Sequence, residues 1–368
     1  MKILFISHAM VVDVYREKFI YLADNGRNEV VLLTPKKWKE AGQIVTMKPS
    51  DNKLYQSTAT LRLFKFHGAT FLYGPKVFKI IRNLKPDIIH VEEEPFSLAI
   101  LEILILKSVL HRTSKVIFFT WQNIYKNYLP PFNLIEQYVL KRVDGAIAGN
   151  HEAVKILKGK GFAKPIAVIP QIGIEPKSSM QKETAWFGKN KFTIGFIGRL
   201  EKEKGIATLL SAVTDLRIDY ELWIIGNGSY IKELNKIAAQ SEDYKKLKII
   251  QGVAHHEIPR FLDKLDVLIL PSRTTPKWKE QFGRILIEAM ACGIPVIGSS
   301  SGAIPEVIGD AGLVFDEDSP EELANHLVKI FEDVELRKTL TERGRERVLK
   351  NYAASVIAEK TLKFYKNL

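Results

Sequence analysis

Short apolar runs alternate along this chain with longer segments in which apolar positions recur at helical spacing. In the first half the runs are KILFISH, EVVLLTP, PDIIHVE, KVIFFTW, DGAIAGN and PIAVIP. In the second half they are FTIGFIGRL, DYELWIIGNG, LKIIQGV, DVLILPS, IPVIGSS and GLVF. Short strands that are apolar along their whole length and separated by helices are typical of parallel sheets covered on both faces. The pattern therefore predicts an α/β protein with two doubly wound, Rossmann-like parallel sheets.

The segments between these runs set the expected domain boundaries. We expect helices over residues 15–25 and 97–111, and a helical pattern also covers residues 352–368. The stretch over residues 170–190 is polar, contains Pro and Gly, and lacks periodicity, which favours a connection between domains. This places an N-terminal domain over residues 1–172 and a C-terminal domain over residues 190–351.

Length and composition bound the class of protein. With 368 residues, 46% hydrophobic and 26% charged, the chain is long enough for two ordinary domains with their own cores. Its first residues lack the pattern of a secretory leader, and the longest apolar stretch, residues 98–110, is too short to span a membrane. The single cysteine, Cys292, excludes an internal disulfide and fits a reducing compartment. We expect a cytoplasmic protein.

Positive charge is concentrated in the first half. Residues 1–172 carry 25 Lys and Arg against 14 Asp and Glu, whereas residues 173–368 carry 29 against 28. Such asymmetry suggests an anionic partner: a membrane surface, a phosphorylated acceptor or nucleic acid. The alternative is charge that serves general solubility. A nucleic-acid-binding protein is disfavoured because the basic residues are dispersed and no recognition motif accompanies them.

One helical segment connects this charge to a membrane hypothesis. FLYGPKVFKIIRNLK places an apolar face opposite several lysines. The apolar positions are Val77, Ile80, Ile81 and Leu84, and the lysines are Lys76, Lys79 and Lys85. The helix could lie on an anionic membrane, or its apolar face could pack against its own sheet. On the first interpretation the protein would be peripheral on the inner face of a membrane.

Ligands of parallel sheets bind where strands end, so the loops after the strands are candidates. FIGRLEKEKG holds Arg199 and Lys204 ahead of a predicted helix, and an Arg, a Lys and a helix N-terminus suit a diphosphate. Solvated surface charges are the alternative. The phosphate loop GxxxxGK[ST] and the dinucleotide fingerprint GxGxxG are both absent.

Two glutamates flank the most informative loop. On a continuous helix Glu280 and Glu288 would be about 12 Å apart along the axis, whereas hydrolytic carboxylate pairs stand about 5–9.5 Å apart. We therefore interpret them as holding two ends of an elongated, hydroxyl-rich ligand. Phe282 and Gly283 add backbone amides, and glycine there would allow close approach of a ligand. The alternative for Glu288 is an ion pair with a basic residue such as Arg199.

Three motifs carry a family resemblance. GRLxxxKG at residues 198–205, PS…ExFGxxxxEAMAxGxPVI at 271–297 and SGAIPE at 301–306 are similar to those of the retaining nucleotide-sugar glycosyltransferases of family 4. IPQIGIE at 169–175 resembles, more weakly, that family's interdomain segment. The resemblance implies a GT-B fold, two Rossmann-like domains facing across a cleft, with the N-terminal domain binding the acceptor and the C-terminal domain the donor. It also implies that the helix over 352–368 crosses back onto the first domain.

The resemblance assigns roles on the donor side. Arg199 and Lys204 would bind the diphosphate and stabilise its charge, Glu280 would hold the donor sugar and Glu288 the ribose. The remaining donor-binding candidates are Gly198, Gly252, Val253, Phe282, Gly283 and Arg284. The implied enzyme is a retaining, hexosyltransferase-like glycosyltransferase (EC 2.4) whose leaving diphosphate takes the acceptor proton. No cofactor and no metal are expected, and His255-His256 is interpreted as polar surface.

The acceptor side departs from the family pattern. The first loop, SHAMVVDVYREK, has no glycine, and Gln122 stands where many relatives have a histidine. Acceptor-side candidates are His8, Asp13, Arg16, Trp121, Gln122 and Asn123. Glu92-Glu93-Glu94 could also touch an acceptor, or form a solvated acidic loop. A lipid-linked or anionic acceptor, a small soluble acceptor, a sugar-nucleotide epimerase and an inactive GT-B scaffold all remain open.

Overall fold

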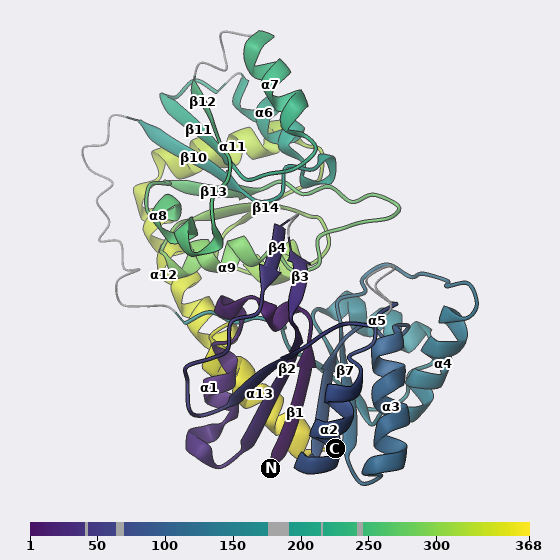
Figure 1. The fold of residues 1–368 in the computed structure, drawn as a ribbon. Helices are drawn as coiled ribbons and strands as arrows, with labels where there is room; N and C mark the ends of the chain where they lie inside the picture. The colour runs from purple at the N-terminus through teal and green to yellow at the C-terminus, as the bar shows by residue number, and fades with distance from the viewer. Residues whose placement is uncertain (41–42, 64–69, 176–190, 215, 241–245) are drawn as a thin grey trace. The chain divides into compact units, whose positions relative to one another are not determined.

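The chain folds into two compact units. A computed structural model describes residues 1–40, 43–63, 70–175, 191–214, 216–240 and 246–368. Unit 1 comprises Met1–Gly173 together with Ala354–Leu368, and unit 2 comprises Ile174–Ala353 (Figure 1). Most of the expected interdomain connection, residues 176–190, lies outside the described residues.

Unit 1 is built on a parallel sheet whose strand order is β5-β2-β1-β6-β7-β8-β9. The strands are β1 (Lys2–Ser7), β2 (Glu29–Pro35), β5 (Gln56–Thr60), β6 (Ile88–Glu92), β7 (Lys115–Thr120), β8 (Gly145–Ala148) and β9 (Ile166–Val168). Its helices are α1 (Lys18–Leu22), α2 (Pro75–Leu84), α3 (Leu98–Leu110), α4 (Phe132–Arg142), α5 (His151–Gly159) and α13 (Ala354–Lys366). All six strands expected for the first half are present.

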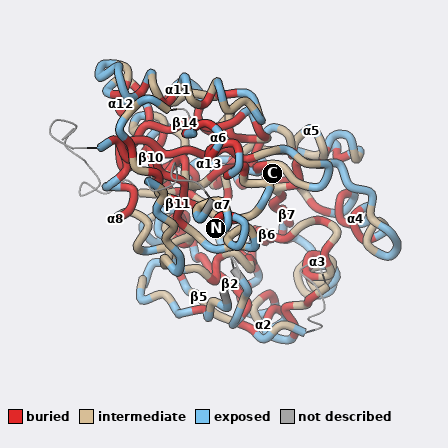
Figure 2. The backbone as a smooth tube through the Cα atoms, turned by 90° about the horizontal axis from the view of Figure 1, so that it is seen from above, coloured by how far each residue is buried: buried red, intermediate tan, exposed pale blue. Residues whose placement is uncertain are grey.

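Alternate residues of each strand face opposite layers, as a period of two requires. In β1, Leu4 and Ile6 pack in the core shared with α2, α3, α4 and α5. Ile3 and Phe5 pack in the opposite core, which includes Phe19 of α1 and residues of α13. Because both faces are covered, the strands are buried almost throughout, as Figure 2 shows by colour.

Three features of unit 1 differ from the expected elements. The helix expected over 15–25 is reduced to α1 between short 3₁₀ turns, because Asp24 and Asn25 take left-handed backbone angles that end it. Strand β5 was not predicted: its sequence, QSTAT, is polar and lies at the sheet edge. The antiparallel hairpin of β3 (Lys37–Glu40) and β4 (Gln43–Thr46) was also missed.

Helix α2 decides between the two interpretations of its apolar face. Val77, Ile81 and Leu84 are buried in the core of unit 1, and Ile80 packs against that core. The helix therefore rests on its own sheet, and its apolar face does not lie on a membrane. Among the described helices, none is long and apolar enough to cross a bilayer.

Unit 2 holds the second parallel sheet, ordered β12-β11-β10-β13-β14-β15. Its strands are β10 (Phe192–Ile197), β11 (Tyr220–Ile225), β12 (Leu247–Ile250), β13 (Val267–Leu270), β14 (Val296–Ser299) and β15 (Leu313–Phe315). Its helices are α6 (Ile206–Thr214), α7 (Ile231–Gln240), α8 (Ile258–Leu262), α9 (Arg284–Ala291), α10 (Ile304–Ile308), α11 (Pro320–Glu332) and α12 (Val334–Asn351). The prediction of two doubly wound parallel sheets is confirmed.

Candidate functional site

The donor-side candidates gather where β10 and β13 end in unit 2. Lys204 Nζ donates to Glu280 Oε2 at 2.6 Å, and Ser272 Oγ donates to the same oxygen at 2.7 Å. The ammonium also lies 4.7 Å from the ring centroid of Trp278. Both charged side chains are nearly buried, so each supplies the partner that a buried charge requires. The structure thus brings two of the three expected catalytic residues together as an ion pair.

Backbone packing holds Glu280 in place. Ala303 N donates to the Glu280 carbonyl at 3.0 Å. Gly302 has φ +55°, and a Cβ there would lie 2.0 Å from the same carbonyl oxygen, so only glycine fits between the two loops. Earlier in the same loop, Arg273 forms an ion pair with Asp318. The segment 271–280 is therefore fixed to the loops that follow β14 and β15.

Arg199 occupies a different environment from Lys204. It follows β10 directly, is exposed, and makes no hydrogen bond to any other described residue. Gly198 before it belongs to the strand edge, since its N–H donates to the Ile225 carbonyl at 3.0 Å. The guanidinium is therefore a cation available to an anion at the end of β10.

Glu288 is held by two basic neighbours, Arg284 and His255. Arg284 Nε lies 2.8 Å and His255 Nε2 3.3 Å from Glu288 Oε1. The ion-pair alternative is thus realised with Arg284, one helical turn earlier, and not with Arg199. Helix α9 begins only at Arg284, so the continuous-helix spacing assumed for Glu280 and Glu288 does not apply.

The remaining donor-side candidates have structural roles that the sequence did not reveal. Gly283 has φ +80° and stands at the N-cap of α9, where a Cβ would meet Leu270 at 2.8 Å; its glycine is explained by the backbone and by packing. Phe282 is buried, with its ring centroid 5.7 Å from that of Tyr352. Gly252 N donates to Asn227 Oδ1 at 3.2 Å, and Val253 follows it, half-buried.

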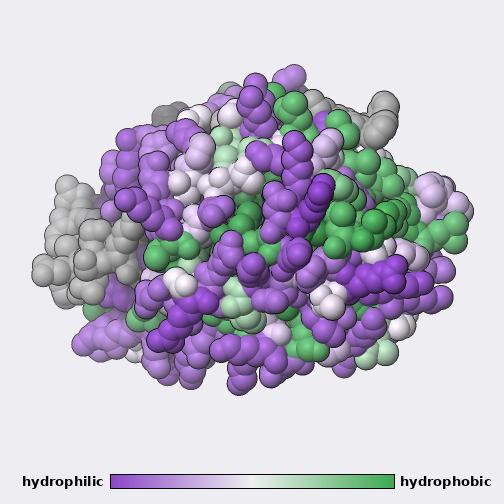
Figure 3. Space-filling model, turned by 60° about the horizontal axis from the view of Figure 1, so that its bottom comes forward, coloured by the Kyte–Doolittle hydropathy of each residue, from purple (hydrophilic) through white to green (hydrophobic). Residues whose placement is uncertain are grey.

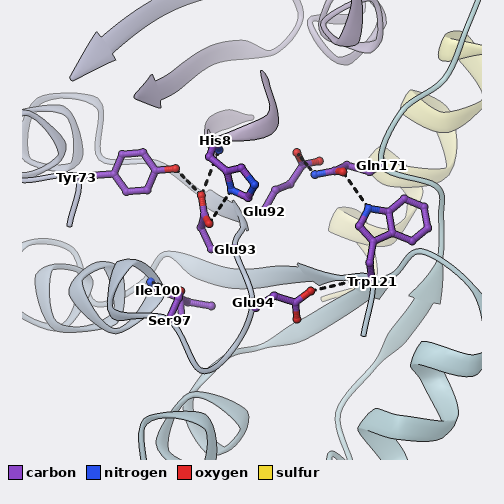
Figure 4. A network of polar contacts seen from close by, with 9 residues as sticks. All are labelled: His8, Tyr73, Glu92, Glu93, Glu94, Ser97, Ile100, Trp121 and Gln171. Carbon is purple, nitrogen blue, oxygen red and sulfur yellow. Dashed lines mark hydrogen bonds and ion pairs between the residues drawn. The ribbon is translucent and has the colours of Figure 1, made fainter. Parts of the chain in front are cut away.

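In unit 1 three consecutive glutamates begin at Glu92, the last residue of β6, and each is engaged by a different segment (Figure 4). Glu92 and Glu93 are buried, and Glu94 is half-buried. The interpretation of this stretch as a solvated acidic loop is therefore wrong. Each carboxylate has polar partners that offset its desolvation.

Glu93 joins the first loop to the segment before α2. His8 Nδ1 lies 2.8 Å from Glu93 Oε2, and the Tyr73 hydroxyl donates to Glu93 Oε1 at 2.6 Å. Because a carboxylate only accepts, Nδ1 donates in this contact. The ring of His8 lies 4.3 Å from that of Trp38, which in turn carries Arg62 at 4.5 Å. Burial and the neighbouring Glu93 raise the pKa of Tyr73 well above its usual range.

Glu92 forms a buried ion pair with Lys18. Lys18 Nζ donates to Glu92 Oε1 at 2.6 Å and to the Gln171 carbonyl at 2.7 Å. Gln171 also donates to Glu92 Oε2 and accepts from Trp121 Nε1 at 3.0 Å. Burial lowers the pKa of Lys18, and Glu92 opposes that change. The network fixes the weak IPQIGIE motif to the end of the sheet.

The loop after β7 is held from both ends. Glu94 accepts from Thr120 Oγ1 at 2.6 Å and from the Trp121 N–H at 3.2 Å, and burial raises the pKa of Glu94. Gln122 is buried: its Nε2 donates to Tyr128 Oη at 3.0 Å and its Oε1 accepts from Lys160 Nζ at 3.3 Å. Gln122 therefore supports the loop with both ends of its amide.

The remaining three acceptor-side candidates have different environments in the structure. Arg16 is buried, and its guanidinium donates to the carbonyls of Met10, Val11 and Lys48. Three of its five N–H donors are thus used to hold the first loop and the segment at Lys48 together. Asp13 is exposed in that loop. Asn123 is buried beside Gln122.

Sequence reasoning missed several members of this site. Four of them come from segments that are distant along the chain: Lys18 in α1, Trp38 in β3, Tyr73 just before α2 and Lys160 just after α5. The sequence did contain one signal for these partners. Three acids in a row after a buried strand, in a basic half of the chain, need cations or hydroxyl groups beside them. Within the described residues, no three His, Cys, Asp or Glu side chains are grouped as metal ligands would be.

Comparisons with known proteins bear on the family of this chain. The family model "Glycosyl transferases group 1" matches residues 179–347, and "Glycosyltransferase Family 4" matches residues 20–172. The spore coat protein SA of Bacillus subtilis is 30% identical over 207 residues, covering 52% of this chain and 53% of that protein. A GDP-mannose-dependent phosphatidylinositol monomannoside mannosyltransferase of Corynebacterium glutamicum is 26% identical over 232 residues, covering 61% and 59%. The matched region thus spans little more than half of these relatives.

Solved structures resemble the fold over the whole chain. Sucrose-phosphate synthase from Thermosynechococcus elongatus superposes with a TM-score of 0.73 at 17% identity, covering 100% of this chain and 98% of that one. HepE from Anabaena, solved with UDP, gives the same TM-score and identity and is covered completely. At that identity the likeness shows the GT-B fold alone. The two family matches, in chain order and one on each unit, show that this chain belongs to the group 1, family 4 glycosyltransferases.

Proposed function

We propose that this protein transfers a sugar from a nucleotide-diphosphate donor to an acceptor hydroxyl with retention of anomeric configuration. The acceptor is lipid-linked or otherwise anionic, and the product contributes to a glycan, glycolipid or cell-surface polysaccharide. Unit 2 binds the donor and unit 1 the acceptor. The single observation that carries the proposal is the Lys204–Glu280 pair, with Ser272 and Trp278, at the ends of β10 and β13.

The chemistry follows from the charges at that site. Arg199 and Lys204 stabilise the charge on the departing diphosphate, which is the main electrostatic demand of the reaction. The bond from the anomeric carbon to the diphosphate breaks as the acceptor oxygen forms its own bond on the same face. The acceptor proton passes to a leaving phosphate oxygen. Glu280 holds hydroxyls of the sugar, and Glu288 holds those of the ribose.

Related proteins support the substrate classes. HepE was solved with UDP and with UDP-glucose, and several relatives are named as GDP-mannose-dependent enzymes acting on phosphatidylinositol monomannosides. Another relative, an N-acetyl-α-D-glucosaminyl L-malate synthase of Bacillus anthracis, is named for a small acceptor. The names of the mannosyltransferases and the HepE complex with UDP-glucose each contain a nucleotide sugar. We favour the lipid-linked acceptor because of the basic first half of the chain.

The proposal is tested by thermal shift against UDP-, GDP-, ADP- and dTDP-sugars. One donor should raise the melting temperature of the wild type, and Glu288→Ala should reduce that shift, whereas Glu321→Ala, an exposed change on α11, should not. No shift with any donor would refute donor binding. The stabilising donor is then incubated with candidate acceptors, and the anomeric configuration of the product is read by NMR. Conversion of the donor sugar without an acceptor would indicate an epimerase instead.

A further inference from the structure

The outward face of helices α2, α3 and α4 in unit 1 has an unusual composition. Helix α3, LAILEILILKSVL, is apolar on all sides, although only one side can pack on the sheet. Helices that are apolar all round are normally buried. Here Ile105 and Val109 are 50% and 74% exposed. The helix therefore leaves an apolar stripe uncovered in the part of the chain that the structure describes.

Neighbouring segments extend this stripe. Leu134 of α4 is 59% exposed, and Leu129, in the loop before α4, is 81% exposed. Helices α3 and α4 pack side by side, so these residues belong to one surface. Figure 3 shows apolar side chains gathered on the side of unit 1 where these helices lie, bordered by hydrophilic ones. Exposed apolar patches of this kind mark contact sites for proteins or membranes.

The exposed charges on these three helices are all positive. The exposed cations on the three helices and their connections are Lys76, Lys79, Arg82, Lys85, Arg112, Lys115, Lys126, Lys141 and Arg142. In the connections, Asp87 is an exposed acid, and Lys115 lies 3.5 Å from the partly exposed Asp144. The helices contain only two acids, and both are occupied: Glu102 accepts from the N–H groups of Tyr73 and Gly74, and Glu136 is buried against Lys160. Of the described residues on these helices, none exposes a carboxylate fully.

We propose that this surface docks on a lipid bilayer that contains anionic lipid. Its apolar side chains enter the interface and its cations meet the headgroups, the two signals that together give stable peripheral binding. A protein partner of similar size would bring some positive charge to the contact, whereas an anionic bilayer presents only the complementary sign. The proposal adds a partner to the proposed function and rests on it for its purpose, which is to bring unit 1 to a lipid-linked acceptor.

The loop after β7 connects this surface to the acceptor-side residues. It begins at Trp121, whose indole belongs to the Glu92–Gln171 network, and it ends at the exposed Leu129 and the start of α4. Lys160 holds its middle through Gln122 and the Lys126 carbonyl. An acceptor headgroup at the ends of the strands and a lipid chain at the docking surface would therefore lie on one continuous stretch of unit 1.

The test is co-sedimentation of the full chain with vesicles of phosphatidylcholine, with and without phosphatidylglycerol. We expect binding only with the anionic lipid, weakened by added salt because the cations are exposed. Lys79→Glu with Arg82→Glu should weaken binding about thirtyfold or more, since each basic residue near an anionic surface contributes about fivefold. Lys232→Glu with Lys236→Glu, a matched reversal on α7 of unit 2, should leave binding unchanged.

A second double variant tests the contribution of the exposed apolar side chains to vesicle binding. Val109→Asp with Leu134→Asp should weaken binding at least about tenfold, because burial of each apolar side chain is lost. Leu349→Asp, at an exposed leucine of α12, is the control. All variants should keep the thermal shift given by the donor nucleotide, which shows that they are folded.

Three results would overturn the proposal: no binding to anionic vesicles, binding that neither pair of variants reduces, or a dimer in solution that Val109→Asp dissociates. The last would assign the surface to a second copy. Vesicle binding is measured without donor or acceptor, so it can fail while donor binding persists. Conversely, a wild type that binds vesicles but is shifted by no nucleotide sugar would refute the transfer and leave the docking surface standing.

Discussion

Replacing Glu280 with glutamine should have opposite effects on two steps: the diphosphate should bind more tightly, and the sugar should be transferred more slowly. In the structure Lys204 Nζ is 2.6 Å from Glu280 Oε2, and both side chains are about one-tenth exposed. At an effective dielectric constant of about 20, two unit charges at that distance attract by about 6 kcal/mol. A donor diphosphate that recruits Lys204 must give up part of this attraction before it gains its own.

The net effect is smaller than the gross attraction. Glu280→Gln keeps the shape of the side chain and exchanges an ion pair for a hydrogen bond from the ammonium to a neutral amide oxygen, a difference of about 1–2 kcal/mol. Lys204 is then more easily drawn to phosphate, so the Kd for the free nucleoside diphosphate should fall about 5- to 30-fold. The Kd for the complete nucleotide sugar should fall less, because contacts from Glu280 to the sugar are weakened. The rate of transfer should drop at least about tenfold as the sugar loses its orientation.

Isothermal titration with the nucleoside diphosphate and with the nucleotide sugar measures both constants, and a steady-state assay measures the rate. Glu321→Gln, which neutralises an exposed carboxylate on α11, controls for net charge. If Glu280→Gln weakens the diphosphate and the nucleotide sugar by the same factor, Glu280 does not compete for Lys204, and the reasoning from the ion pair fails.

Three further changes test unit 1. Lys18→Met should lower the free energy of unfolding, measured in urea, by about 3–5 kcal/mol because it leaves the Glu92 carboxylate buried without its cation. Adding Glu92→Leu should recover part of that loss, and a double variant no more stable than Lys18→Met would contradict this reasoning. Burial and the nearby Lys18 hold the pKa of His90 well below its usual value. The unfolded chain therefore takes up that proton first, so the melting temperature should fall as pH drops below about 6.5, and His90→Leu should flatten this dependence. Glu93→Gln should raise the KM for acceptor about tenfold through loss of one charge-assisted bond to His8, with the donor Kd unchanged; equal changes in both would refute an acceptor role.

The fold could be predicted because its signal is local. Each central strand is a short apolar run that is buried on both faces, so pattern and environment agree along the whole element. Strand β5 escaped detection because its polar sequence pairs with one neighbour only, at the sheet edge. The expected helix over residues 15–25 was too long because periodicity does not register the left-handed turn at Asn25.

The site was predictable only as far as its residues lie close together in sequence. The motif around Glu280 is contiguous and could be recognised, but its ion pair with Lys204 joins positions 76 residues apart. Glu288 illustrates the same limit. A basic partner was expected as an alternative, yet spacing alone did not select Arg284, one turn away, over Arg199.

The net charge counted from the sequence of unit 1 understates the positive electrostatic potential at its surface. Three of the acids that offset the lysines in sequence are turned inward: Glu92, Glu93 and Glu136 are buried, and each is bound to a lysine, a histidine or a hydroxyl within the unit. Buried carboxylates in such pairs contribute little to the potential outside, whereas exposed lysines on α2 and α4 contribute fully. The outer surface of these helices is therefore more positive than the sequence implies. The proposal of an anionic partner for unit 1 therefore rests on which charges the fold exposes, and not on the net charge itself.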